Sequence, residues 1–294
     1  GLSVVRSDDG GLTFSQPVKI AEITGFNPFD TARDCGDGTE LCPSEFVFAR
    51  VPLEPRLTSD PTGELEGVFS VWQASDLDTI EPSDTSYSST GPGTSGTDDV
   101  AQGAVYVSRS IDDGQTWGPA VRVSDVPDGH QFFPDADALA GRLAVMWQDS
   151  RPDPCYDVQL PIGNMEDATS CGTAIVDTFV AVSEDGVNFD PAVQASSVAN
   201  QPQYEMFANR QVPFYGDYNW IQLVELGDGS LFGYLTWTDN RDVVEGTDSR
   251  EEEQDGFDVH QCRALQPDGT YGPDTCPNAG GLNQNIYGNS VTIP

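Results

Sequence analysis

Ser7-Asp8-Asp9-Gly10-Gly11-Leu12-Thr13-Phe14 and Ser110-Ile111-Asp112-Asp113-Gly114-Gln115-Thr116-Trp117 share one pattern, Ser-x-Asp-x-Gly-x-Thr-aromatic. A weaker copy at 182–189 keeps Gly186 and Phe189, and a vestigial copy occupies 266–271. An extended, β-rich run precedes each copy, and another follows each of the first three. The pattern therefore predicts strand, tight Asp-rich turn, strand.

A second repeat is interleaved with the first. Apolar runs end in tryptophan at 67–72, 141–147 and 229–237. The last two continue as Trp-x-Asp-x-Arg, whereas the first continues without an arginine. One unit is therefore a strand, a strand ending in Trp, a loop, a strand, an Asp-rich turn and a strand. This order predicts a four-stranded antiparallel blade, repeated radially as in a β-propeller.

We therefore predict a single all-β domain over 1–294, with about four blades visible. Two segments exceed the length of a blade: 77–100 is rich in Ser, Thr, Gly and Pro, and 242–256 is acidic. We expect both to be solvated loop insertions with little packing value.

The charge is strongly negative, because 13 basic and 48 acidic side chains give 13 − 48 = −35. A phosphate backbone needs a basic face, so the charge excludes nucleic acid as a partner and disfavours an anionic membrane surface. No apolar run approaches the length of a membrane span. The excess of Asp suits a saline habitat or calcium binding, and an acidic surface that serves solubility is the alternative.

The six cysteines form three close pairs along the chain. Neighbour pairing is favoured among the 15 pairings that six thiols permit, because each pair brackets one polar, turn-rich stretch. Disulfides indicate an oxidising compartment, so we expect a secreted or cell-surface protein. The chain begins at Gly1 inside a strand-like run, which fits a processed or incomplete chain. The predicted pairs are Cys35 with Cys42, Cys155 with Cys171, and Cys262 with Cys276.

The repeated turn resembles the Asp-box, or BNR, repeat of the sialidase superfamily, from the first box at Ser7 to the vestigial copy near Tyr271. The resemblance implies that each box aspartate bonds backbone amides, that each glycine has a positive φ, and that each aromatic residue packs between strands. It implies a structural role for the box residues. The catalytic members of the family have six blades, so the chain is part of a six-bladed propeller, and closure with fewer blades is the alternative. The implied structural residues are Ser7, Asp9, Gly11, Thr13, Phe14, Ser110, Asp112, Gly114, Thr116, Trp117, Gly186 and Phe189.

Catalytic sialidases hold the substrate carboxylate with three arginines and use a Tyr nucleophile and an Asp acid/base. Arg50-Val51-Pro52 is similar to the motif of the first arginine, and Asp76 follows at about the family's distance. The family's second arginine is missing from 69–71. An ordinary structural contact of Arg50 is therefore the alternative.

Arg151 and Arg241 end the two Trp-x-Asp-x-Arg segments. They are candidates for a carboxylate or glycan contact, and the alternative is a structural Asp–Arg bridge repeated from blade to blade. Tyr215 and Asp217 follow a Pro-containing segment and resemble a Gly-Asp-Tyr element of bacterial Asp-box proteins, so they are further catalytic candidates.

Four carboxylates crowd around the Cys155–Cys171 loop, and hard oxygen ligands suit calcium. A solvated acidic loop is the alternative, and no cofactor is required by any motif. These carboxylates belong to Asp153, Asp157, Glu166 and Asp167.

Three functions remain open. The leading hypothesis is a sialidase-like module that recognises a glycan or an extracellular protein. The second is a glycoside hydrolase of the exo-sialidase type. The third is a structural component of an extracellular assembly, which self-associates through open blade edges. The fold class alone does not choose between them.

Overall fold

The computed structural model describes residues 1–30, 55–84, 87–90, 99–154, 156–159, 162, 175–200, 218–239, 241 and 285–294. Within these ranges the chain is all-β, and its one helical element is the short 3-10 helix Leu77–Thr79. No helix in the described residues is long and apolar enough to cross a membrane.

Three antiparallel sheets and a two-stranded pair make up most of the described structure, and each connects its strands in chain order. The N-terminal pair is β1 (Leu2–Val4) with β2 (Val18–Ala21). Sheet I comprises β4 (Arg56–Thr58), β5 (Val68–Ser75), β9 (Gly103–Ser110) and β10 (Val121–Arg122). Sheet II comprises β11 (Gln131–Leu139), β12 (Arg142–Asp149), β13 (Asp177–Ser183) and β14 (Val193–Gln194). Sheet III comprises β15 (Trp220–Glu225), β16 (Leu231–Asp239) and β17 (Asn285–Ile293).

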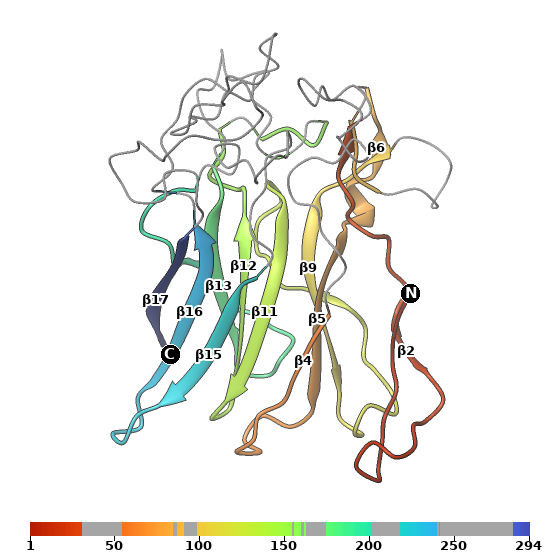
Figure 1. The fold of residues 1–294 in the computed structure, drawn as a ribbon, viewed down its shortest axis with the longest axis vertical. Coiled ribbons are helices and arrows are strands. Elements are labelled where there is room, and N and C mark those ends of the chain that lie inside the picture. Colours follow the sequence, from red (N-terminus) through yellow and green to blue (C-terminus); the bar gives the residue numbers. More distant parts are fainter. Residues whose placement is uncertain are drawn as a thin grey trace, which may run out of the picture.

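The sheets stack in sequence order, from the N-terminal pair on one side to β17 on the other (Figure 1). Alternation along a strand explains the stacking, because successive side chains point to opposite faces. On β12, Leu143, Val145 and Trp147 pack against sheet I, whereas Ala144 and Met146 pack against sheet III. Sheet II is therefore buried on both faces, as its nearly continuous apolar strands require.

Polar side chains also tie the sheets together. The Oε1 atom of Gln73 on β5 accepts a hydrogen bond of 2.6 Å from the backbone N–H of Phe133 on β11. Phe133 has a φ of 51° and lies where the register of β11 shifts. Asn219 donates to the carbonyl of Phe133 at 2.8 Å, and Gln148 donates to Asn219 at 3.3 Å. The irregular backbone of β11 is thus held from both neighbouring sheets.

The two strong Asp-rich turns have hydrogen bonds from backbone amides to the aspartate, as the resemblance implied. Asp9 accepts from the N–H groups of Leu12 and Thr13 at 3.0 and 2.9 Å, and from the Thr13 hydroxyl at 2.6 Å. Asp112 accepts from the N–H and hydroxyl of Thr116 at 2.8 and 2.6 Å. The glycines Gly11, Gly114 and Gly186 have φ values of 91°, 80° and 76°.

The aromatic residue of the first turn differs from the expectation. Trp117 and Phe189 pack into the interface between their own sheet and the preceding one. Phe14 is instead 62% exposed. The physical reason is its position in the N-terminal pair: among the described residues, no earlier sheet packs on that side. The expectation that Phe14 packs between strands is therefore wrong for this structure.

The segment 77–100 is also more than a solvated insertion. Its described parts form β6 (Glu81–Pro82), which pairs with β8 (Asp99–Val100), and β7 (Tyr87–Ser88), which pairs with β3 (Phe29–Asp30). Tyr87 and Val100 are fully buried. The low hydrophobicity of the segment gave no indication that these two side chains are buried. The second predicted insertion, 242–256, lies outside the described residues.

Candidate functional site

The two predicted site arginines follow the ends of β12 and β16, where the same polar arrangement recurs, which we call the Trp–Asp–Arg clamp. In sheet II, Trp147 donates its indole N–H to Asp149 at 2.7 Å. The guanidinium of Arg151 donates to the same carboxylate at 2.9 Å through Nε and lies 2.7 Å from it through Nη2. The Asp149 side chain is fully buried, so this carboxylate depends on these donors for its charge.

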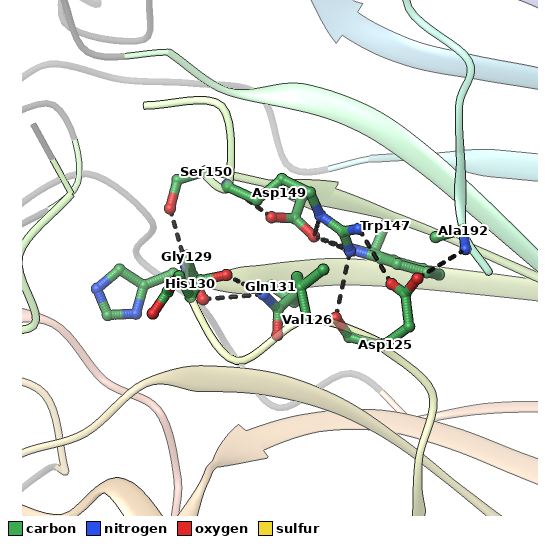
Figure 2. A network of polar contacts seen from close by, with 12 residues as sticks. Asp125, Val126, Gly129, His130, Gln131, Trp147, Asp149, Ser150 and Ala192 are labelled. Carbon is green, nitrogen blue, oxygen red and sulfur yellow. Dashed lines mark hydrogen bonds and ion pairs between the residues drawn. The ribbon is translucent and has the colours of Figure 1, made fainter. Parts of the chain in front are cut away.

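Arg151 also reaches the preceding sheet. Its Nη1 pairs with Asp125 at 3.1 Å, and its Nη2 donates to Ser124 at 3.2 Å, both after the last strand of sheet I. Its guanidinium lies 4.3 Å from the ring centroid of Phe179. Figure 2 shows Asp125 and Asp149 in this network, beside Trp147. The clamp therefore fixes sheet II to sheet I.

Sheet III repeats the clamp. Trp237 donates to Asp239 at 2.9 Å, and Arg241 pairs with the same buried carboxylate. The Arg241 guanidinium lies 4.0 Å from the ring centroid of Tyr287. Both candidate arginines are thus engaged in Asp–Arg bridges, which is the structural alternative that the repeated sequence raised.

Of the other catalytic candidates, Asp76 makes a different ion pair, and the rest lie outside the described residues. Asp76 lies at the end of β5, where its carboxylate pairs with Arg122 at 2.7 Å. Arg50, Tyr215 and Asp217 lie outside the described residues, and so do all six cysteines, so their roles stay predictions.

A cleft of about 670 Å³ lies among the segments that follow β5, β10 and β12. Two predicted residues, Asp153 and Asp157, line it together with Arg151. The complete described lining is Thr79, Glu81, Gln102, Pro127, Asp128, Arg151, Asp153, Tyr156, Asp157 and Val158. The cleft is therefore acidic, with four carboxylates against one guanidinium, and that guanidinium already pairs with Asp149 and Asp125.

Burial changes the chemistry of the cleft wall. It raises the pKa of Asp153 from 3.8 to about 6, against a hydrogen bond from the backbone of Ile175. Burial also raises the pKa of the Tyr156 phenol above its ordinary value. Asp153 is therefore a carboxyl group that can exchange a proton near neutral pH.

Two buried polar atoms lack partners among the described residues, one on a residue of the cleft lining and one on a residue packed against Tyr156. The Oε1 atom of Gln102 accepts no hydrogen bond, although Gln102 is 1% exposed and its amide donates to the carbonyl of Gly129. Behind Tyr156, His130 accepts from the N–H of Gly103 at 3.0 Å, and burial lowers its pKa to about 3. His130 is thus neutral and carries its proton on Nε2, which has no described partner.

The calcium prediction finds no support within the described residues. They contain no group of three or more His, Cys, Asp or Glu side chains that could hold a metal ion. Glu166 and Asp167 lie outside these residues, so calcium binding at the predicted site stays a prediction.

Sequence reasoning missed the polar lining residues Glu81, Gln102, Asp128 and Tyr156, of which the first three come from segments distant in sequence from Asp153. Asp128 precedes Gly129, which marks a turn, but no motif distinguishes the other three. Their common position depends on the stacking of the sheets.

No protein-family model and no curated protein matches this chain. Among solved structures, the α-L-arabinanase of Penicillium chrysogenum complexed with arabinobiose has a TM-score of 0.38 at 16% identity, covering 80% of this chain and 49% of that one. The GH93 α-L-arabinofuranosidase of Fusarium graminearum with arabinobiose has a TM-score of 0.34 at 13% identity, covering 97% of this chain and 57% of that one. This chain therefore spans about half of the length of those two enzymes. At these scores neither their fold nor their activity is assigned to it.

Proposed function

We propose that this chain is part of a sialidase-like Asp-box β-propeller, secreted or on a cell surface, whose acidic cleft recognises a neutral glycan. The observation that carries the proposal is the cleft lining, which presents four carboxylates and one guanidinium, that of Arg151, which is already engaged in ion pairs. Sugar hydroxyls are donors as well as acceptors, so they complement such a lining.

The propeller interpretation rests on the order and stacking of the sheets. Sheets I, II and III are antiparallel meanders that pack face to face. The Asp-rich turn recurs in the N-terminal pair, sheet I and sheet II, and the Trp–Asp–Arg clamp recurs in sheets II and III. Radial repetition of such units is the architecture of a propeller. Disulfides between neighbouring cysteines, and hence the extracellular location, belong to the same proposal.

Charge decides between a neutral and an acidic sugar. A sialic acid carboxylate is bound most strongly by the fork of an unpaired guanidinium. In the described cleft, Arg151 is the one basic side chain, and its donors point to Asp149, Asp125 and Ser124. An anionic sugar would therefore meet the carboxylates of Asp128 and Asp157 without compensation.

A glycan-binding screen of the purified chain tests this function. Neutral glycans should be retained and their sialylated counterparts should not. Asp128→Asn alters an exposed lining residue and should weaken the retained glycan severalfold, because a charged acceptor forms the stronger hydrogen bond. Asp190→Asn, at an exposed site away from the lining, is the matched control. Retention of sialylated glycans alone would overturn the proposal.

A glycoside hydrolase is the second candidate, and the raised pKa of Asp153 favours it. A glycosidase needs one protonated carboxyl to protonate the leaving oxygen and a second carboxylate for the other face of the sugar. Asp153 suits the first role, and Asp157 also lines the cleft. Turnover of neutral aryl glycosides, lost in Asp153→Asn but kept in Asp190→Asn, would establish hydrolysis. Turnover of a fluorogenic α-sialoside would instead support the exo-sialidase type.

A further inference from the structure

The first sheet has lost the clamp that the next two sheets share. The strand registers align Trp72 with Tyr106, Trp147 with Phe179, and Trp237 with Tyr287. The position two residues after the tryptophan is Asp149 in sheet II and Asp239 in sheet III, but Ala74 in sheet I. The position four residues after it is arginine in sheets II and III, but Asp76 in sheet I.

A pocket of about 290 Å³ lies where the clamp is missing. Trp72, Ala74, Asp76 and Tyr106 all line it, so the pocket contains every position of the altered clamp. The remaining lining residues are Glu22, Ile23, Thr24, Ser75, Leu77, Asp78 and Ala120. The pocket therefore occupies the gap between the N-terminal pair and sheet I, which corresponds to the gap that Arg151 fills between sheets I and II.

The tryptophan of this pocket has an unsatisfied donor. Trp72 is 1% exposed, and its indole N–H has no hydrogen-bond partner among the described residues. The equivalent N–H groups of Trp147 and Trp237 donate to the aspartates of their clamps. An indole nitrogen only donates, so Trp72 requires an acceptor from outside the described chain.

The acceptors and the aromatic ring of a guanidinium site remain. Asp78 supplies a carboxylate, and Glu22 supplies a second that Lys19 and the Gly1 ammonium partly neutralise. Asp76 is already engaged, because it accepts from Arg122 and from the backbone N–H of Asp78. Arg122 neutralises Asp76, so among the described residues Asp78 is the one carboxylate of the lining without an ion pair. The Tyr106 ring corresponds to the rings of Phe179 and Tyr287, over which the guanidinium groups of the other sheets lie at 4.3 and 4.0 Å. Cations are attracted to such ring faces.

We propose that this pocket binds the guanidinium group of an arginine-sized ligand, in place of the guanidinium that the chain itself supplies in sheets II and III. Arginine also brings a carboxylate, or a carbonyl within a peptide, and either oxygen can accept the hydrogen bond from Trp72. Free arginine and an arginine side chain of a peptide are the two sources of this chemistry.

Isothermal titration calorimetry at 0.15 M NaCl tests the proposal. L-Arginine and methylguanidinium should bind, and L-citrulline, which replaces the guanidinium with a neutral ureido group, should bind at least tenfold more weakly than L-arginine. L-Lysine carries the same charge as arginine, so it reports nonspecific attraction to this acidic protein, and it should also bind more weakly. Tighter binding of N-acetyl-arginine methylamide than of L-arginine would indicate a peptide as the source. Equal binding of citrulline or lysine, or no binding of arginine, would overturn the proposal.

Substitutions of lining residues test whether arginine binds in this pocket. Asp78→Asn and Tyr106→Leu should each weaken arginine severalfold, whereas Asp190→Asn should leave it unchanged. Ala74→Asp combined with Asp76→Arg rebuilds the clamp of sheets II and III and should abolish arginine binding. A folded double variant, with an unchanged circular dichroism spectrum, that still binds arginine would show that the site is elsewhere. If that variant does not fold, unchanged affinity in both single variants would contradict the proposal equally.

Discussion

Removal of the Asp149 carboxylate should lower the free energy of unfolding of the protein substantially. Asp149 is fully buried and receives the indole N–H of Trp147, the backbone N–H of Arg151 at 2.7 Å and the Arg151 guanidinium. Asp149→Ala leaves those donors in place without their acceptor. The same substitution at Asp125, whose side chain is 36% exposed, leaves the clamp itself intact.

The expected loss in the free energy of unfolding follows from how deeply each carboxylate is buried. Breaking a buried ion pair by removing one partner costs about 3–5 kcal/mol. Arg151 retains its second pair with Asp125, so we expect a value near the lower limit, about 3 kcal/mol, for Asp149→Ala. Loss of an exposed pair costs about 0.2–1 kcal/mol, which is the range expected for Asp125→Ala.

Urea unfolding at pH 7, followed by tryptophan fluorescence and circular dichroism, measures both variants. Arg151→Met should also be strongly destabilising, because it leaves the Asp149 charge buried. The double variant Asp149→Ala/Arg151→Met should cost less than the sum of the two single variants, since no isolated charge remains. Additive effects, or a loss below about 1 kcal/mol for Asp149→Ala, would refute the assignment of Arg151 to the clamp.

Three further predictions concern pH and backbone support. The pKa of Asp153 is about 6 in the folded state and 3.8 in the unfolded state. The folded state therefore binds this proton more tightly, and the stability that it contributes is lost as pH rises from about 4 to 6. Asp153→Asn should remove that part of the Tm-against-pH profile. The turn hydrogen bonds, led by the Thr116 hydroxyl, lower the pKa of Asp112 to about 2, so its contribution is present above pH 3.8 and lost as pH falls towards 2. The Tm difference between wild type and Asp112→Asn should therefore shrink between pH 5 and pH 2, and a constant difference would contradict this. Gln73→Ala removes the acceptor of the Phe133 N–H and should cost about 1–3 kcal/mol in urea unfolding, whereas an unchanged midpoint would show that this bond is dispensable.

The sequence predicted the features whose contacts are local. The Asp112 turn closes within four residues, so its aspartate, glycine and threonine are sufficient to determine it. The strands that contain Trp147 and Trp237 could be recognised because an apolar run ending in tryptophan repeats along the chain. The Asp–Arg bridges also span only two residues, which is why repetition pointed to a structural role.

The remaining features depend on contacts between distant segments. Asp76 pairs with Arg122, 46 residues away, and no motif links the two. The burial of Tyr87 and the exposure of Phe14 are set by which sheet lies beside each residue. The cleft likewise gathers Gln102 and Asp153 from separate loops, so its composition became evident only after the sheets were placed.

Binding of one glycan in neutral and sialylated form tests the central claim most directly. Titration calorimetry should use the neutral glycan that the screen retains most strongly and the same glycan capped with sialic acid. We expect the neutral form to bind and the capped form to bind at least tenfold more weakly. Tighter binding of the sialylated form, lost in a folded Arg151→Met variant, would show that Arg151 holds a ligand carboxylate and would contradict the account.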